Sequence, residues 1–253
     1  MGRIISIINQ KGGVGKTTTA VNLAAYLAEA GRRTLLIDTD AQGNATSGLS
    51  MDSSRFVHTL YDVLIDGVSA ENAVYRTEVK RLSLLPASID LAGAEIEMVD
   101  MDERETILRR RLAPLRDAYD FILIDCPPSL GLMTVNALTC ADGVIIPIQA
   151  EFFALEGLSQ LVKTVNTVKK RLHPELELLG ILLTMYDGRT NLAVQVSEEV
   201  KKYFGKKVFK TFIPRAVKLS EAPSFGEPIA VYAPKSKGAA AYRSLCQEVL
   251  KRV

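Results

Sequence analysis

The chain has 253 residues, of which 47% are hydrophobic, and a formal net charge of +2. This length and composition allow a sizeable core, and the simplest organisation is one domain over residues 1–253. No apolar run reaches the roughly 20 residues that cross a membrane, and three scattered cysteines with two histidines argue against a disulfide framework or structural zinc. We therefore expect a protein of the reducing cytoplasm, without a signal peptide because a strand-like run begins at Ile4.

Strand-like apolar runs alternate with helical patterns, which predicts an α/β fold: a doubly wound, mostly parallel sheet with helices on both faces. The expected strands are Ile4–Ile8, Thr34–Ile37, Leu82–Leu85, Phe121–Ile124, Gly143–Ile148, Leu178–Met185 and Val208–Phe212. The expected helices are a first one that ends near Gly31, then Ser88–Val99, Asp102–Tyr119, Leu130–Ala141, Ala154–Leu172, Leu192–Phe204 and Gly238–Arg252. The sheet should reverse direction beside the first strand, and such sheets bind ligands there, at the carboxyl ends of the strands.

The run NQKGGVGKTTT, residues 9–19, lies between the first strand and the first helix. Glycines in this setting let backbone N–H groups and a helix N-terminus converge on a phosphate. In the P-loop pattern, Lys16 contacts the β- and γ-phosphates and Thr17 ligates Mg²⁺. Gln10 stands where the pattern has glycine, and a second lysine, Lys11, follows it. This departure indicates one branch of the large class of P-loop nucleotide-binding proteins. The predicted nucleotide-binding residues are Lys11, Gly12, Gly13, Val14, Gly15, Lys16, Thr17 and Thr18.

Three carboxylates follow apolar strands beside this loop. Asp38 and Asp40 come after the strand that starts at Thr34, and Asp125 comes after the strand that starts at Phe121. We predict that Asp125 reaches Mg²⁺ through water, as a Walker B acid does. Asp38 is predicted to hold the water shell of the ion, and Asp40 to orient or activate the attacking water. The alternative for Asp38 and Asp40 is a loop carboxylate that caps a helix.

The expected base is adenine. A GTPase carries an Asn/Thr-Lys-x-Asp motif on a late strand, and the run Thr184-Met185-Tyr186-Asp187 has methionine in place of that lysine. This departure favours ATP over GTP.

Charge is divided unevenly along the chain. Up to Val162 there are 14 Lys or Arg and 21 Asp or Glu, whereas from Lys163 onward there are 17 and 8. A basic half of this kind indicates a polyanionic partner such as nucleic acid or a lipid surface. The alternative is that these lysines lie on solvated helix faces.

Four sequence blocks carry a resemblance to a known family. KGGVGKTT, LLIDTDAQGNATSGL, FILIDCPPSLGLMTVNAL and IPRAVKLSEAPSFGEPI, in this order, resemble the ParA/Soj partitioning ATPases of the deviant Walker A group, which includes MinD. The resemblance runs from Arg3 to the final helix. It departs at Ala41, where the family usually has proline, with little expected consequence. The helix-turn-helix extension of larger plasmid members is missing, which implies no operator recognition.

The resemblance implies an ATPase that uses ATP and Mg²⁺ to partition chromosomes or plasmids. Lys11 matches the signature lysine that reaches the partner's phosphates in an ATP-sandwiched homodimer, and Gly12 lies where the subunits approach. Lys16 matches the P-loop lysine, Asp40 the carboxylate needed for hydrolysis, and Asp125 the Walker B acid.

The same resemblance implies a DNA-binding cycle. Pro214 should border the adenine, and Arg189 and Lys218 match positions implicated in non-specific binding of double-stranded DNA. The dimer would associate with the nucleoid in the cytoplasm, and a ParB/Spo0J-type centromere-binding protein would stimulate hydrolysis and release. The acidic stretch Glu95–Glu105 is a candidate surface for that partner.

Two other functions compete with this one. A MinD-like membrane-cycling ATPase would need a C-terminal amphipathic helix, and the stripe from Tyr242 to Val249 is short and better explained by docking on the core, so we expect no stable membrane association. An ATPase of the nitrogenase iron-protein type would need cluster-ligating cysteines at an interface, whereas Cys126 is expected to be a small buried residue.

Overall fold

The computed structural model of the protein describes residues 2–49, 56–151 and 154–253. Its strands form a seven-stranded sheet in the order β3-β4-β2-β5-β1-β6-β7. All neighbours are parallel except β3 and β4, which are antiparallel. The strands are β1 (Arg3–Ile7), β2 (Thr34–Asp38), β3 (Tyr75–Arg76), β4 (Leu82–Leu85), β5 (Phe121–Asp125), β6 (Gly143–Gln149) and β7 (Glu177–Thr184).

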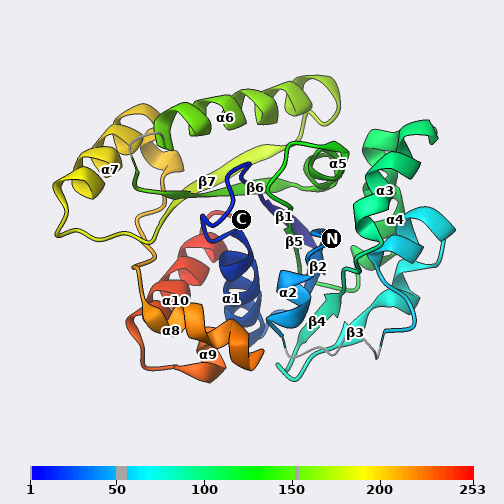
Figure 1. Ribbon diagram of the computed structural model, residues 1–253, viewed down its shortest axis with the longest axis horizontal. Coiled ribbons are helices and arrows are strands. Elements are labelled where there is room, and N and C mark those ends of the chain that lie inside the picture. The colour runs from blue at the N-terminus through cyan, green and yellow to red at the C-terminus, as the bar shows by residue number, and fades with distance from the viewer. Residues whose placement is uncertain (1, 50–55, 152–153) are drawn as a thin grey trace.

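Helices cover both faces of this sheet (Figure 1). Helices α1, α8, α9 and α10 pack on one face, and α3 to α7 pack on the other. The α-helices are α1 (Lys16–Glu29), α2 (Asn44–Ser47), α3 (Leu91–Glu97), α4 (Ile107–Leu112), α5 (Leu132–Cys140), α6 (Ala154–Arg171), α7 (Asn191–Phe204), α8 (Val217–Glu221), α9 (Ile229–Tyr232) and α10 (Lys237–Leu250). The predicted doubly wound, mostly parallel α/β fold is confirmed.

Side-chain alternation explains how one strand serves both layers. In β1, Ile4 packs with the α3–α7 layer, while Ile5 and Ile7 pack with the α1–α10 layer. A strand buried on both faces reads as a continuous apolar run, and all residues of β2 and β5 are buried. β1 lies between β5 and β6, so the sheet reverses beside the first strand as predicted.

The prediction of a strand at Val208–Phe212 is wrong. Only Val208 forms a bridge, to Ile181. The backbone N–H groups of Lys210 and Thr211 donate instead to the carboxylate of Glu248 on α10, at 2.9–3.1 Å. A side chain distant in sequence therefore takes two donors in the middle of the segment, while the Phe209 N–H still donates to the carbonyl of Ile181 on β7.

The expected helix Asp102–Tyr119 is broken. Its α-helical part is α4 alone, flanked by 3₁₀ turns at Arg104–Thr106 and Ala113–Leu115. Pro114 lies in the second turn, where its missing N–H and its ring prevent a continuing α-helix. The expected helix Ser88–Val99 is shorter too, because α3 begins at Leu91 and passes into a 3₁₀ turn at Met98.

The C-terminal helix docks on the core, as the sequence predicted. Tyr242, Leu245, Cys246 and Val249 are all buried, and the Tyr242 hydroxyl lies 3.2 Å from that of Thr19 on α1. The apolar face of α10 is thus occupied by α1. In the described ranges, no helix combines the length and the apolar character that a membrane crossing requires.

Candidate functional site

The site lies at the carboxyl ends of the central strands. Ile7 at the end of β1 pairs in register with Asp125 on β5, which also pairs with Asp38 on β2. The chain then leaves β1 through the glycine loop and enters α1 at Lys16. Parallel strands therefore bring the loop and two of the predicted carboxylates to one edge of the sheet.

Two glycines of the loop adopt a backbone conformation that other residues rarely take. Gly13 and Gly15 have φ of +73° and +86°, in the left-handed region. Gly12 differs, because its φ is not positive and a Cβ added there would meet no described residue within 4 Å. The fold of the subunit therefore requires glycine at 13 and 15 but leaves open space at 12.

Residues that the sequence analysis did not identify brace this loop. The Thr184 hydroxyl donates to the carbonyl of Val14 at 2.7 Å, and the Gln149 side-chain amide donates to the carbonyl of Gly13 at 3.0 Å. Asn9 donates to the carbonyl of Pro147 at 2.7 Å. Thr184 and Gln149 end β7 and β6, and their position at strand ends was the available signal.

Replacing Thr184 by valine tests this bracing. The substitution keeps the shape but removes a buried donor to Val14, so the free energy of unfolding should fall by about 1 kcal/mol. A less fixed loop should also bind ATP more weakly. Urea unfolding and nucleotide titration measure both effects. Thr167→Val is the matched control, because the Thr167 hydroxyl bonds a carbonyl on the exposed face of α6; equal losses in both variants would contradict the bracing role.

The two lysines of the loop have different surroundings. Lys16 is buried, and its ammonium donates to the carbonyl of Lys11 at 3.2 Å. Burial lowers the pKa of Lys16, although nearby Asp125 acts in the opposite direction. The ammonium of Lys11 is half exposed and is bonded to the carboxylate of Glu151. Lys16 is thus enclosed in the site, while Lys11 is held at its rim.

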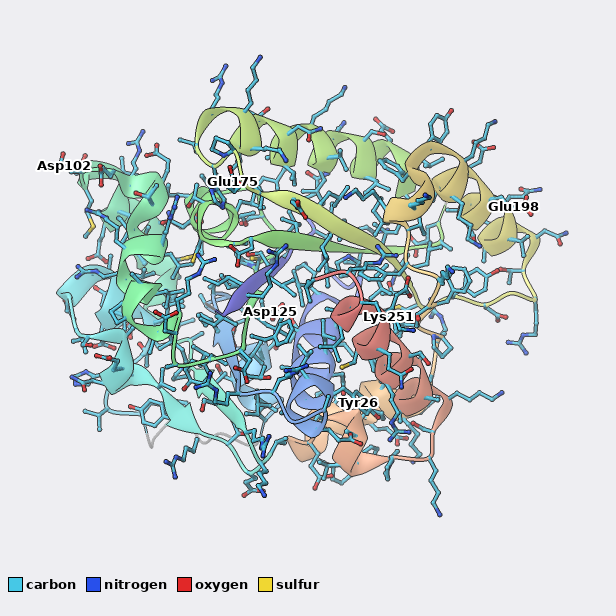
Figure 2. The ribbon with its side chains drawn as sticks, turned by 180° about the vertical axis from the view of Figure 1, so that it is seen from behind. Tyr26, Asp102, Asp125, Glu175, Glu198 and Lys251 are labelled. Atoms are coloured by element: carbon cyan, nitrogen blue, oxygen red, sulfur yellow. The ribbon has the colours of Figure 1, made fainter. Side chains whose placement is uncertain are left out.

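Asp125 lies in the middle of the molecule (Figure 2) and is fully buried. Neither of its oxygens has a hydrogen-bond partner among the described residues. Burial, with help from Asp38, raises its pKa well above the usual value, and Thr17 and Lys16 oppose this. A buried carboxylate with open oxygens fits a cation.

The donor set near Asp125 matches magnesium. Mg²⁺ keeps several waters and takes one or two carboxylates together with substrate phosphates. In the described ranges, no group of three His, Cys, Asp or Glu side chains surrounds a common point. Thr17 and the open carboxylate of Asp125 are the residues that would hold such an ion together with the phosphates.

Asp38 and Asp40 have different surroundings, one buried and hydrogen-bonded and the other at the cavity. Asp38 is buried and its oxygens accept from the Thr46 N–H and hydroxyl at 2.8 Å and from the Asp40 N–H at 3.2 Å. Asp38 thus ties α2 to β2, which resembles the capping alternative, and its link to a metal stays a prediction. Asp40 accepts from the Gln42 N–H at 3.0 Å and lines the central cavity.

That cavity has a volume of about 580 Å³. Its walls come from the glycine loop, Asp40, α2, Pro128 and the segment 222–227. A second cavity of about 190 Å³ shares Gly15, Thr18 and Met185 with it and is lined by Pro214. Most of the predicted phosphate-binding residues therefore line one compartment, and the residue expected beside adenine lines the adjoining one.

The predicted DNA-binding residues line neither of these two cavities. Arg189 precedes α7 with a side chain 90% exposed, and its guanidinium pairs with Asp187 at 2.7 Å. That pairing holds the pKa of Asp187 at about 2. Lys218 on α8 pairs with Glu221 at 2.8 Å. Both cations lie on the surface.

The cysteines are buried and reduced. Cys126 and Cys140 pack in the α3–α7 layer, and Cys246 packs in the α1–α10 layer. Burial raises the pKa of Cys140 to about 12 and that of Cys246 to about 11. The confirmed role of Cys126 is that of a small core residue, which gives no support to a cluster-carrying ATPase.

Comparison with known proteins identifies relatives over the whole length. The family described as "AAA domain" matches residues 2–178. "Sporulation initiation inhibitor protein Soj" of Bacillus subtilis is 57% identical over 98% of both chains, and "Chromosome partitioning protein ParA" of Myxococcus xanthus is 56% identical over 100% of this chain and 89% of its own.

Solved structures agree in fold. A cobyrinic acid a,c-diamide synthase from Mycobacterium smegmatis, with bound ADP and magnesium, is 40% identical with a TM-score of 0.87 over 99% of this chain and 95% of its own. The cell division ATPase MinD of Pyrococcus furiosus is 31% identical with a TM-score of 0.84 over 100% of both chains.

The sheet, the glycine loop entering α1 and the aspartates at adjacent strand ends define a P-loop protein of the deviant Walker A class. Within that class, the identities of 56–57% to Soj and ParA over nearly the full length show the family of this chain. The chain belongs to the Soj/ParA family of chromosome-partitioning ATPases.

Proposed function

We propose that this protein hydrolyses ATP to partition chromosomes or plasmids. ATP with Mg²⁺ joins two subunits, the dimer binds double-stranded DNA without sequence preference, and a ParB/Spo0J-type centromere-binding protein stimulates hydrolysis and release. The observation that best supports this function is that residues 12–18, Asp40 and Asp125 lie together at one edge of the sheet. The carboxylate of Asp125 has no hydrogen-bond partner among the described residues. The proposed location is the cytoplasm, on the nucleoid.

Each side chain of the site has a distinct task in hydrolysis. The loop N–H groups and Lys16 bind and orient the phosphates, and Thr17 and Asp125 would hold the magnesium ion. When bound there, magnesium would supply positive charge that offsets the charge developing on the phosphate oxygens. Asp40, exposed to the cavity, orients the attacking water and accepts its proton. Pro214 borders the adenine from the adjoining cavity.

The open space at Gly12 supports dimer formation across the nucleotide. Among the described residues nothing lies within 4 Å of a Cβ added there, and a small residue beside open space suits a neighbour that approaches from outside. Lys11 beside it is at the rim, bonded to Glu151, and is within the same loop as the phosphate-binding N–H groups. A second subunit that faces this loop would receive Lys11 on its own phosphates.

Dimerisation then accounts for a switch in DNA affinity. Arg189, Lys218 and other basic residues of the second half bind phosphates in a way that carries no sequence information. A monomer that binds few phosphates has low affinity, and two linked sets on one duplex raise avidity by about 10²-fold or more. ATP can therefore control DNA binding without any new chemistry.

Duplex-DNA binding with ATP, with ADP and without nucleotide, at two salt concentrations, tests this function. Only ATP should support binding, and affinity should fall steeply with salt. Arg189→Ala should weaken binding and lower the salt slope by about one for each phosphate that the variant no longer binds. Arg110→Ala is the matched control, because Arg110 is also an exposed, ion-paired arginine, on α4. Binding without nucleotide, or a flat salt response, would contradict the proposal.

Two alternatives have weaker support. A MinD-like membrane cycle needs a free amphipathic C-terminal helix, and the apolar side of α10 is packed on α1. A synthase activity is named for a structure that is 40% identical, below the partitioning relatives at 56–57%. Co-sedimentation with liposomes but not with DNA would favour the membrane cycle.

A further inference from the structure

Helix α3 and the residues on either side of it expose an apolar stripe that the other described residues do not cover; Ile89 precedes α3, and Val99 lies in the 3₁₀ turn that follows it. Ile89, Ile96 and Val99 are 69%, 75% and 49% exposed, and Ala92 is exposed between them. Their spacing of three, four and three residues places them on one side of a helical path. We define Ile89, Ala92, Ile96 and Val99 as the α3 stripe. Large apolar side chains gathered in this way mark an interaction site more often than single ones do.

Acidic residues predominate along the α3 stripe, although Arg104, just beyond it, donates to the carbonyl of Val99. The segment 82–103 contains six Asp or Glu residues and no Lys, Arg or His. Asp90, Glu97, Asp100 and Asp102 are exposed. A partner segment that covers the stripe must therefore carry apolar side chains together with lysine or arginine, because like charges would repel it.

Two sets of hydrogen bonds connect this helix to the site. Just before α3, the Ala87 N–H donates to the Thr46 hydroxyl at 3.2 Å, and that hydroxyl donates to Asp38 at 2.8 Å. Within α3, Glu95 accepts from the Met133 N–H at 2.8 Å, at the start of α5. A displacement of α3 would therefore act on the loop that carries Asp38 and Asp40, and on the start of α5, which follows the loop after Asp125.

The packing between α3 and α5 is tight. A Cβ added at Gly131 would lie 2.6 Å from the carboxylate of Glu95. The loop that precedes Gly131 contains Pro128, which lines the central cavity. The α3 stripe is therefore on the surface of an element that directly supports the cavity wall.

The α3 stripe also lies far from α7, the helix that Arg189 precedes. In Figure 1, α3 and α7 occupy opposite ends of the molecule, and in Figure 2 the labelled Asp102 and Glu198, which lie after α3 and on α7, are again at opposite ends. A protein bound to DNA through the region of Arg189 leaves the α3 stripe accessible.

We propose that the α3 stripe is the docking surface for the partner that stimulates hydrolysis, and that it takes a basic segment with apolar side chains. This inference rests on the proposed function. Docking would act on Asp40 through the Thr46–Asp38 connection and on Pro128 through Glu95 and α5.

The test measures ATP hydrolysis with duplex DNA and increasing amounts of the ParB-type protein of the same organism. In the double variant Ile89→Ser/Ile96→Ser, the partner concentration for half-maximal stimulation should rise about tenfold or more. Asp100→Lys/Asp102→Lys should weaken stimulation similarly. Basal hydrolysis should stay within about twofold, because these side chains are exposed and outside the cavity. The control is Val231→Ser on α9, whose side chain is 52% exposed.

The outcomes separate this inference from the function it rests on. Unchanged stimulation of the double variant, with the unmodified protein stimulated, overturns the docking surface alone. Loss of ATP-dependent dimerisation, measured by light scattering, overturns it in favour of an interface between subunits. If the unmodified protein shows no stimulation, the partner-driven step of the proposed function fails, and the docking surface fails with it.

Discussion

Replacing Asp40 by alanine should reduce ATP hydrolysis by about 10²- to 10⁴-fold, which is the range for loss of a general base. ATP binding and ATP-dependent DNA binding should persist, because the loop N–H groups, Lys16 and Thr17 remain. Phosphate release at saturating ATP measures the first effect, and DNA co-sedimentation measures the second. The variant should accumulate on DNA, since release requires hydrolysis.

Asp66→Ala provides the control for Asp40, because Asp66 is an exposed carboxylate outside the cavity. Its turnover should match that of the unmodified protein. Normal hydrolysis in Asp40→Ala would remove Asp40 from the mechanism, and loss of ATP binding would show that it positions the substrate instead.

Replacing Gly12 by valine should abolish dimer formation and lower ATP-dependent DNA affinity by about 10²-fold, which is the avidity that two linked sites have over one. The added side chain projects into open space, so the thermal midpoint of the monomer should hardly change. Light scattering with ATP and DNA titration measure the two losses. Gly12→Ala should show a smaller loss of the same kind.

The interpretation of Gly12 depends on folding being intact. A fall in the thermal midpoint would place the cost inside the subunit and contradict the open geometry. A stable variant that still dimerises would show that the subunits do not approach at residue 12.

The central sheet could be predicted because its strands are buried on both faces. The runs before Asp38 and Asp125 are continuously apolar, and no other element type suits such short runs bounded by turns. The glycine loop was also predictable, since it combines glycine, lysine and threonine at a fixed spacing between a strand and a helix.

Other features depend on side chains distant in sequence. In the segment Val208–Phe212, backbone N–H groups donate to the carboxylate of Glu248. The residues near position 208 contain no signal that predicts this acceptor. Asp38 follows a strand just as Asp125 does, but Thr46 satisfies its oxygens and leaves those of Asp125 open. Sequence alone gives the two aspartates the same appearance, and tertiary hydrogen bonding separates them.

The ion pair between Lys11 and Glu151 has a consequence for the kinetics of assembly. Both side chains are about half exposed, and such a pair contributes about 0–1 kcal/mol, or at most about a fivefold change in an equilibrium constant. Breaking the pair is therefore a small barrier when a second subunit arrives. If the proposed function holds, Glu151 keeps Lys11 in one orientation, and Lys11 can replace this ion pair by one with a phosphate of the second subunit.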